Sequence, residues 1–162
     1  MNKPISSGLR TTFLVHFILG LIFGLLLLLI PETFLGMFSW KVTQPATYRL
    51  VGAAILGFTM SSWFGYKAAT WDQVRIVVLA ELVWAPLATL VMLWGMISGD
   101  FPPTAWINVV IFGGFSIAFW ISYNQQEAAA AIKAPAFNAP APKAPAPKAP
   151  ARKAARRKRG RG

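Results

Sequence analysis

Long apolar stretches alternate with short polar connections over the first 127 residues of the chain. The apolar stretches cover residues 11–30, 50–66, 75–97 and 106–123, and only the third contains an internal acid. The hydrocarbon core of a bilayer is about 30 Å thick, so a spanning helix needs roughly 20 residues and tolerates about 17 to 25. All four stretches meet this requirement, and the pattern therefore predicts an all-α polytopic membrane protein with four transmembrane helices.

The connections between these stretches are short, covering residues 32–49, 67–74 and 98–105. Short connections make consecutive helices antiparallel neighbours. We therefore expect residues 1–127 to form one transmembrane domain, a four-helix bundle with up-down-up-down topology.

The last part of the chain, residues 128–162, has a different composition. It consists mainly of Ala, Pro, Lys and Arg, and its few large apolar side chains cannot offset the entropy lost on ordering. This pattern predicts a disordered tail that ends in a cluster of basic residues. The cluster, which we interpret as a polyanion-binding segment, comprises Arg152, Lys153, Arg156, Arg157, Lys158, Arg159 and Arg161.

Composition agrees with a membrane protein, because only 13% of the residues are charged, whereas soluble domains contain about 25%. The net charge of +11 comes almost wholly from the tail, which holds ten Lys/Arg and no acid. The rest of the chain has the other six basic residues and all five acids. Anionic lipid, nucleic acid (including the ribosome) and an acidic protein surface are all candidate partners of the tail. A solvated tail that only sets the topology is a fourth possibility.

Basic residues near the helix ends predict the orientation, because cytoplasmic loops carry an excess of Lys and Arg. Lys41 and Arg49 fall on one side of the membrane. The other side receives the tail and four basic residues, namely Lys3, Arg10, Lys67 and Arg75. We therefore expect both termini to be cytoplasmic, in what we interpret as a bacterial cytoplasmic membrane.

Two ionisable side chains, His16 and Glu81, lie inside predicted spanning segments. A charged group at the centre of a membrane helix costs about 2.5 to 3.5 kcal/mol on insertion scales, so such groups usually face the protein interior and have a partner. His16 lies six residues after Arg10, and Glu81 lies six residues after Arg75. Ser61 precedes Lys67 by the same number. Equal spacing from basic anchors predicts equal depth in the membrane.

These residues predict a small polar pocket that opens toward the cytoplasm. Its expected lining is His16, Ser61, Ser62, Glu81 and the carbonyl of Leu82, which Pro86 leaves without its usual helical donor. The pocket has three interpretations. The polar groups satisfy one another and fix the helix packing, they bind a small molecule, a lipid headgroup or a proton, or Glu81 contacts a different protein in a complex.

Small residues predict where the helices contact one another, because they allow backbones to approach closely. They share helical faces with the polar groups, while Leu and Phe are expected to face lipid. The predicted helix-packing residues are Gly20, Gly24, Gly57, Pro86 and Gly113.

The chain lacks the residues that most enzymes need. It has one His, no Cys and no G-x-S-x-G, H-E-x-x-H or P-loop motif. Only His16 and Glu81 are strong candidate metal ligands, fewer than the usual three or four. We therefore predict no metal and no cofactor. The favoured function is a non-enzymatic membrane accessory or scaffold subunit that contacts other membrane subunits or a second copy of itself. The alternative is a small carrier or sensor that uses the His16/Glu81 pocket.

Overall fold

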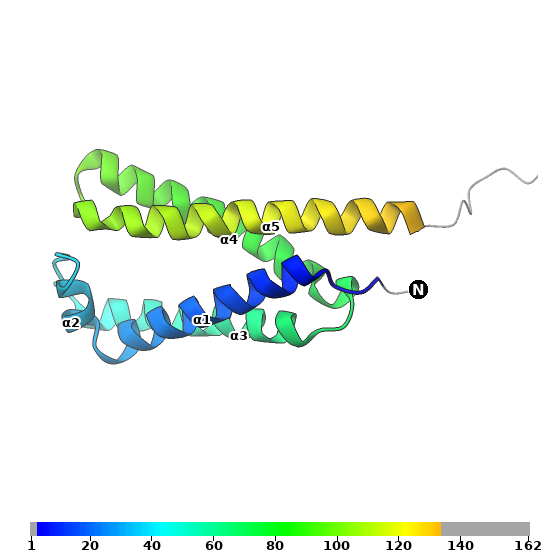
Figure 1. Cartoon of the computed structure of the whole chain (residues 1–162). Helices are drawn as coiled ribbons and strands as arrows, with labels where there is room; N and C mark the ends of the chain where they lie inside the picture. Colours follow the sequence, from blue (N-terminus) through cyan, green and yellow to red (C-terminus); the bar gives the residue numbers. More distant parts are fainter. Residues whose placement is uncertain (1–2, 134–162) are drawn as a thin grey trace, which may run out of the picture.

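The computed structural model describes residues 3–133, with side chains described up to residue 129. Of the predicted disordered tail, residues 128–162, the part from 134 onward lies outside the described residues, whereas residues 128–133 are helical and continue the last helix, so the tail was predicted to begin too early. Within the described residues the fold is all-α, with four long helices and one short one (Figure 1). The elements are α1 (Ser7–Leu29), α2 (Pro31–Gly36), α3 (Pro45–Lys67), α4 (Trp71–Ser98), the 3-10 turn η1 (Pro103–Ala105) and α5 (Trp106–Lys133).

Local sequence signals set several of the helix ends. Ser6 caps α1, and its hydroxyl accepts a hydrogen bond from the N–H of Leu9 at 3.2 Å. Thr70 and Gln73 form a capping box at the start of α4. Gly99 ends α4 with φ of 77°, a left-handed conformation that glycine adopts at little cost. Because α3 ends at Lys67 and α4 begins at Trp71, the connection between these two helices is only residues 68–70.

Three of the long helices are long and apolar enough to cross a membrane, namely Ser7–Leu29, Trp71–Ser98 and Pro103–Ala129. This indicates an integral membrane protein. The fourth long helix, α3, has 23 residues but falls short in hydropathy. Many large apolar side chains on the outward faces are exposed, among them Phe64, Ile76 and Trp94. Exposed apolar surface of this extent is expected where a protein contacts lipid.

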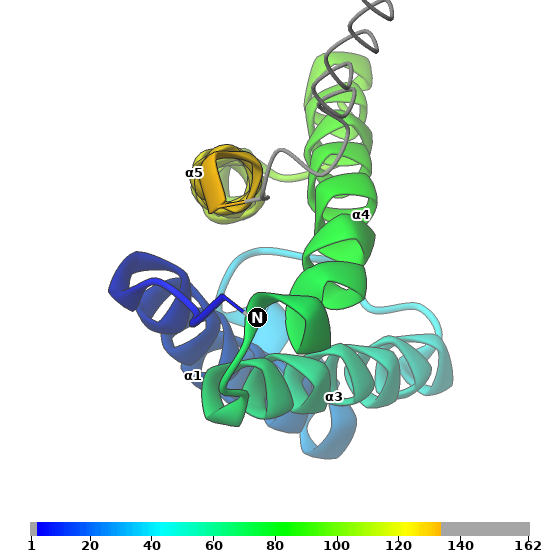
Figure 2. The ribbon, with the colours of Figure 1, turned by 90° about the vertical axis from the view of Figure 1, so that its right-hand side faces the viewer.

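The helices pair as two hairpins rather than as one evenly packed bundle. In Figure 1 α1 lies beside α3 in one layer, and α4 lies beside α5 in the other. Figure 2 shows that α4 begins next to the end of α3 and then runs away from the α1–α3 layer. The long helices of the two hairpins therefore lie close together at one end and diverge toward the other.

The shared end is closed by a hydrophobic core. Phe13 and Phe119 lie at its centre with ring centroids 5.7 Å apart, and neither is exposed. The guanidinium of Arg10 donates to the carbonyls of Tyr66 and Ala68 at 3.3 and 3.0 Å, which ties α1 to the end of α3. The core residues are Ile5, Leu9, Phe13, Trp71, Val74, Val78 and Phe119. Because Lys3, Arg10, Lys67 and Arg75 belong to this region of the fold, we call it the basic end.

Glycines bring α1 and α3 together. A Cβ placed on Gly52 would lie 2.6 Å from the backbone N of Leu28 and 2.8 Å from the carbonyl oxygen of Gly24. Gly20 lies against a side chain instead, because a Cβ placed on it would overlap the hydroxyl oxygen of Thr59. Gly20 and Gly24 therefore lie at a close helix contact, and the residue opposite Gly24 is Gly52, which the sequence pattern did not single out.

The other expected packing residues behave differently. A Cβ on Gly57 would meet no heavy atom within 4 Å, so Gly57 does not lie at a helix contact. The reason is the rotation of α3, which turns Gly52, Thr59 and Ser62 toward α1 and leaves the neighbouring face open. Gly113 makes only an ordinary contact, 3.8 Å from a methyl of Thr89. Pro86 lies inside α4, which continues through it as one helix.

Candidate functional site

A buried polar cluster joins α1, α3 and α4 at one level of the fold. Nδ1 of His16 lies 2.7 Å from Oγ of Ser62, a hydrogen-bond distance, and 3.8 Å from Oε1 of Glu81. The second distance is longer than a hydrogen bond. Ser62 is fully buried and Glu81 is 2% exposed. The structure thus brings three of the four predicted site residues together.

Ser61 does not join this cluster. Its hydroxyl donates to the carbonyl of Phe58 on its own helix at 2.6 Å. Consecutive helical residues point about 100° apart, so only one of two adjacent serines can face α1. That residue is Ser62.

The cluster lacks the geometry of a nucleophile–base relay. In such a relay the nucleophile uses one imidazole nitrogen, and an acid orients the ring through the other. Here Ser62 and Glu81 both approach Nδ1 of His16. Within residues 3–133 no group of three or more His, Cys, Asp or Glu could hold a metal ion. The cluster is suited to fixing the orientation of the His16 ring.

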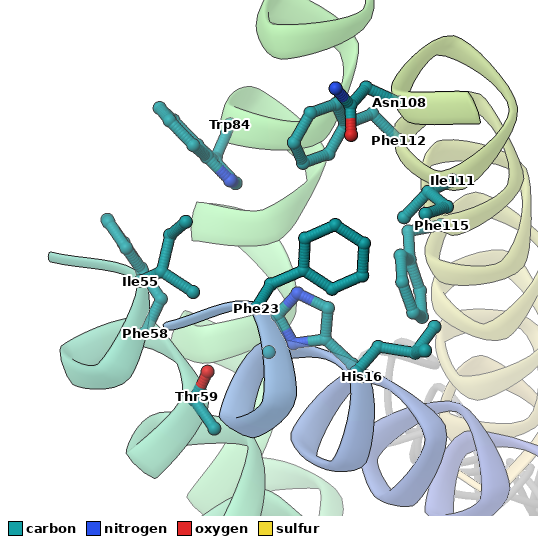
Figure 3. Close-up of a pocket in the computed structure, with 12 residues that line it drawn as sticks. His16, Phe23, Ile55, Phe58, Thr59, Trp84, Asn108, Ile111, Phe112 and Phe115 are labelled. Atoms are coloured by element: carbon teal, nitrogen blue, oxygen red, sulfur yellow. The ribbon is translucent and has the colours of Figure 1, made fainter. Parts of the chain in front are cut away.

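A cavity of about 80 Å³ lies between the hairpins on the side of His16 away from the basic end. We call it the polar cavity. Figure 3 shows its lining, with Phe23 projecting toward the centre and Asn108 at the far side. Its lining includes His16, Phe23, Thr59, Trp84, Asn108 and Phe115. Ser61, Ser62 and Glu81 are absent from the lining. The cavity does not open toward the basic end as expected, because Phe13, Phe119 and Val78 fill that space.

Two polar groups at the polar cavity have unused hydrogen-bonding capacity. Thr59 is 1% exposed, and its hydroxyl has no partner among the described residues. This oxygen lies at the edge of the cavity, packed against Gly20 of α1 (Figure 3). The second nitrogen of His16, Nε2, also has no partner in the described part of the chain, whereas Nδ1 is engaged. A buried polar group left unpaired costs about 1 to 3 kcal/mol, so a molecule that pairs with these groups would bind favourably.

A second space of about 180 Å³ lies farther from His16, and we call it the apolar cavity. It shares Phe23, Ile55, Asn108 and Phe112 with the polar cavity. The remainder of its wall is mostly hydrophobic and includes Leu27, Phe34, Phe38, Tyr48, Met92 and Ile107. The two cavities are therefore neighbours along the cleft between the hairpins.

The segment that follows α2 closes the far end of the cleft. The hydroxyl of Thr104, in η1, donates to the carbonyl of Phe38. The rings of Trp40 and Phe101 lie beside each other with centroids 4.8 Å apart. These contacts tie the first hairpin to the second at the end opposite to the basic end. The cleft is thus covered at both ends of the helices.

The sequence pattern missed Thr59, Asn108 and Trp84. Thr59 and Asn108 are polar residues inside apolar stretches, and this position could have identified them as candidates. A histidine and an acid in such stretches are rarer and were selected instead. For Trp84, nothing in the sequence indicates which aromatic side chains face inward.

Comparison with protein-family models, with curated proteins and with solved structures finds no match to this chain. The candidate site is therefore interpreted from its own chemistry.

Proposed function

We propose that this chain is a non-enzymatic integral membrane protein that binds a small, uncharged, lipid-soluble molecule in the polar cavity. This corresponds to the carrier or sensor that the sequence offers as its alternative function. The observation that carries the proposal is the hydroxyl of Thr59, which is buried, unpaired within the described residues and located at the edge of an otherwise mostly apolar space. His16 faces the same space while Ser62 and Glu81 hold its other edge.

The charge of the lining supports an uncharged ligand. No Lys, Arg, Asp or Glu lines either cavity, so an ion entering there would leave water without gaining a counter-ion. The covering at both ends of the cleft supports a molecule that arrives through the lipid. The absence of a relay geometry supports binding rather than covalent chemistry.

The proposal includes the finer features of the topology. We propose that α3 also crosses the bilayer, which gives four spans, and that the basic end faces the cytoplasm of a bacterial cell. The role of an accessory or scaffold subunit, with a tail that contacts an anionic partner, stays a prediction because it depends on residues beyond 133.

The test compares two variants on the same helix. Wild-type protein is purified in mild detergent, and its bound small molecules are extracted and measured by mass spectrometry. Thr59→Val keeps the side-chain shape but removes the hydroxyl, so we expect occupancy to fall. Ser61→Ala is the matched control, because Ser61 lies outside the polar cavity.

A wild-type protein that carries no small molecule after purification and binds none that is added to it would contradict the proposal. Equal loss of the molecule in Thr59→Val and Ser61→Ala would also contradict it, since the effect would then not come from the cavity. Far-ultraviolet circular dichroism of both variants checks that the helices are intact.

A further inference from the structure

The relation between the two cavities identifies the class of ligand. Resting on the proposed function, we infer that the ligand is a linear amphiphile with an uncharged hydroxyl or carbonyl head in the polar cavity and a hydrocarbon chain in the apolar cavity. The chain would pass the side chain of Phe23, which lines both spaces.

Size argues for a head smaller than an aromatic ring. An engineered protein cavity of about 150 Å³ holds benzene. The polar cavity, at about 80 Å³, is roughly half as large. It has room for a few heavy atoms but not for a ring of that size. The apolar cavity, at about 180 Å³, is large enough for several methylene groups.

The distribution of polar atoms sets the direction of the ligand. His16 and Thr59 line only the polar cavity, and their free groups are one acceptor or donor nitrogen and one hydroxyl. An oxygen that can accept or donate a hydrogen bond pairs with either of them. In the apolar cavity the hydroxyl of Thr104 is already bonded to the carbonyl of Phe38. Tyr48 and Asn108 also line the apolar cavity, and Asn108 lies where the two cavities adjoin, because it lines both. A chain in the apolar cavity therefore meets a wall that is mostly hydrocarbon.

The covered ends of the cleft determine how such a molecule would arrive. The hydrophobic core covers the basic end, and the contacts of Thr104 and Trp40 cover the other. Between α3 and α4, the rings of Phe58 and Trp84 stack with centroids 5.4 Å apart, and both line the polar cavity. Phe58 and Trp84 are 41% and 40% exposed, so they form a wall that lipid would contact. The molecule is therefore one that dissolves in the bilayer.

The experiment uses the full chain in lipid nanodiscs and radiolabelled 1-octanol, 1-butanol and n-octane as probes, measured by equilibrium dialysis against empty nanodiscs. We expect saturable binding of both alcohols. Thr59→Val should weaken both by about tenfold, because the alcohol loses a hydrogen bond in a desolvated site. Octane, which has no head, should bind wild type and Thr59→Val equally.

A second variant tests the position of the chain. Met92 lines the apolar cavity alone, and Met92→Trp would fill that space. We expect Met92→Trp to weaken the affinity for 1-octanol by about tenfold or more and to leave the affinity for 1-butanol unchanged. Val91→Trp is the matched control, since Val91 is exposed and outside both cavities. If Met92→Trp fails to fold, Ile107→Trp replaces it, because Ile107 lines the same cavity from α5.

The outcomes separate this inference from the proposed function. If 1-octanol binds but Met92→Trp and Ile107→Trp leave it unchanged, the chain lies elsewhere and the inference is wrong, although the proposed function stands. If neither alcohol binds while the purified protein still carries another small molecule, the class of ligand is wrong. If the protein releases only phospholipid, an acyl chain fills the cleft and the inference again fails. If it carries nothing and binds no probe, the proposed function fails as well.

Discussion

The contact of Gly52 with α1 gives the sharpest test of the fold. In Gly52→Ala the new Cβ would lie 2.6 Å from the N of Leu28 and 2.8 Å from the carbonyl oxygen of Gly24. Both atoms belong to the backbone, so no side chain can move to relieve the contact and the two helices must separate. Overpacking of this kind costs about 1 to 3 kcal/mol. We expect the upper end of that range, because the shift affects the whole contact between α1 and α3.

A smaller effect opposes this cost. Alanine in a helix interior is more favourable than glycine by about 0.8 to 1.0 kcal/mol. Gly52→Ala should therefore lower the free energy of unfolding by about 2 kcal/mol, the difference between these two contributions. Gly57→Ala receives the same propensity gain without the contact, since nothing lies within 4 Å of its Cβ. It should be neutral or more stable than wild type by up to about 1 kcal/mol.

The assay is reversible unfolding in mixed micelles, with the denaturing detergent as the variable and helical circular dichroism as the signal. Both variants change one glycine to alanine on α3, so the propensity term cancels in their comparison. If Gly57→Ala proved the less stable of the two, α3 would present its other face to α1. The arrangement of the first hairpin described here would then be wrong.

Two further predictions concern the basic end and the tail. Phe13→Ala should lower the free energy of unfolding by about 3 to 5 kcal/mol in the same assay, because Phe13 is fully buried against Phe119, and the exposed Phe64→Ala should change it far less. If the tail binds a polyanion, a chain that lacks residues 134–162 should no longer co-purify with that partner in a pull-down. Added salt should weaken the interaction of the wild-type chain with the partner. If the same molecules co-purify with the wild-type and the shortened chain, the accessory-subunit hypothesis is contradicted.

The number and order of the long helices could be predicted from the sequence, because long apolar stretches and short connections leave few other arrangements. The short helix α2 could not, since residues 31–36 are too few to show a clear period. The divergence of the hairpins was also missed. Small residues on a helix indicate that a close approach is possible, but they do not identify the partner. Gly24 meets Gly52 on α3, and no comparable pair joins α3 to α4.

For the site, counting residues from the basic anchors placed His16 and Glu81 at one depth, and the two side chains do approach each other. Depth along a helix follows directly from the rise per residue, whereas the direction of a side chain depends on how the helix is rotated in its contacts. The sequence pattern named Gly57, Ser61 and Ser62, whereas the structure turns Thr59 and Ser62 toward α1 and leaves Gly57 without a contact. A rotation of one residue was enough to miss the unpaired hydroxyl.

The low hydropathy of α3 fits its place in this architecture. Residues that make it less apolar than its neighbours are the charged Arg49 and Lys67 near its ends and, in its interior, the buried Gly52, Thr59 and Ser62. Gly52 lets the backbone of α1 approach, Ser62 holds His16, and Thr59 faces the polar cavity. A polar group that faces protein does not oppose insertion as one facing lipid would. The shortfall in mean hydropathy therefore does not argue against α3 crossing the bilayer.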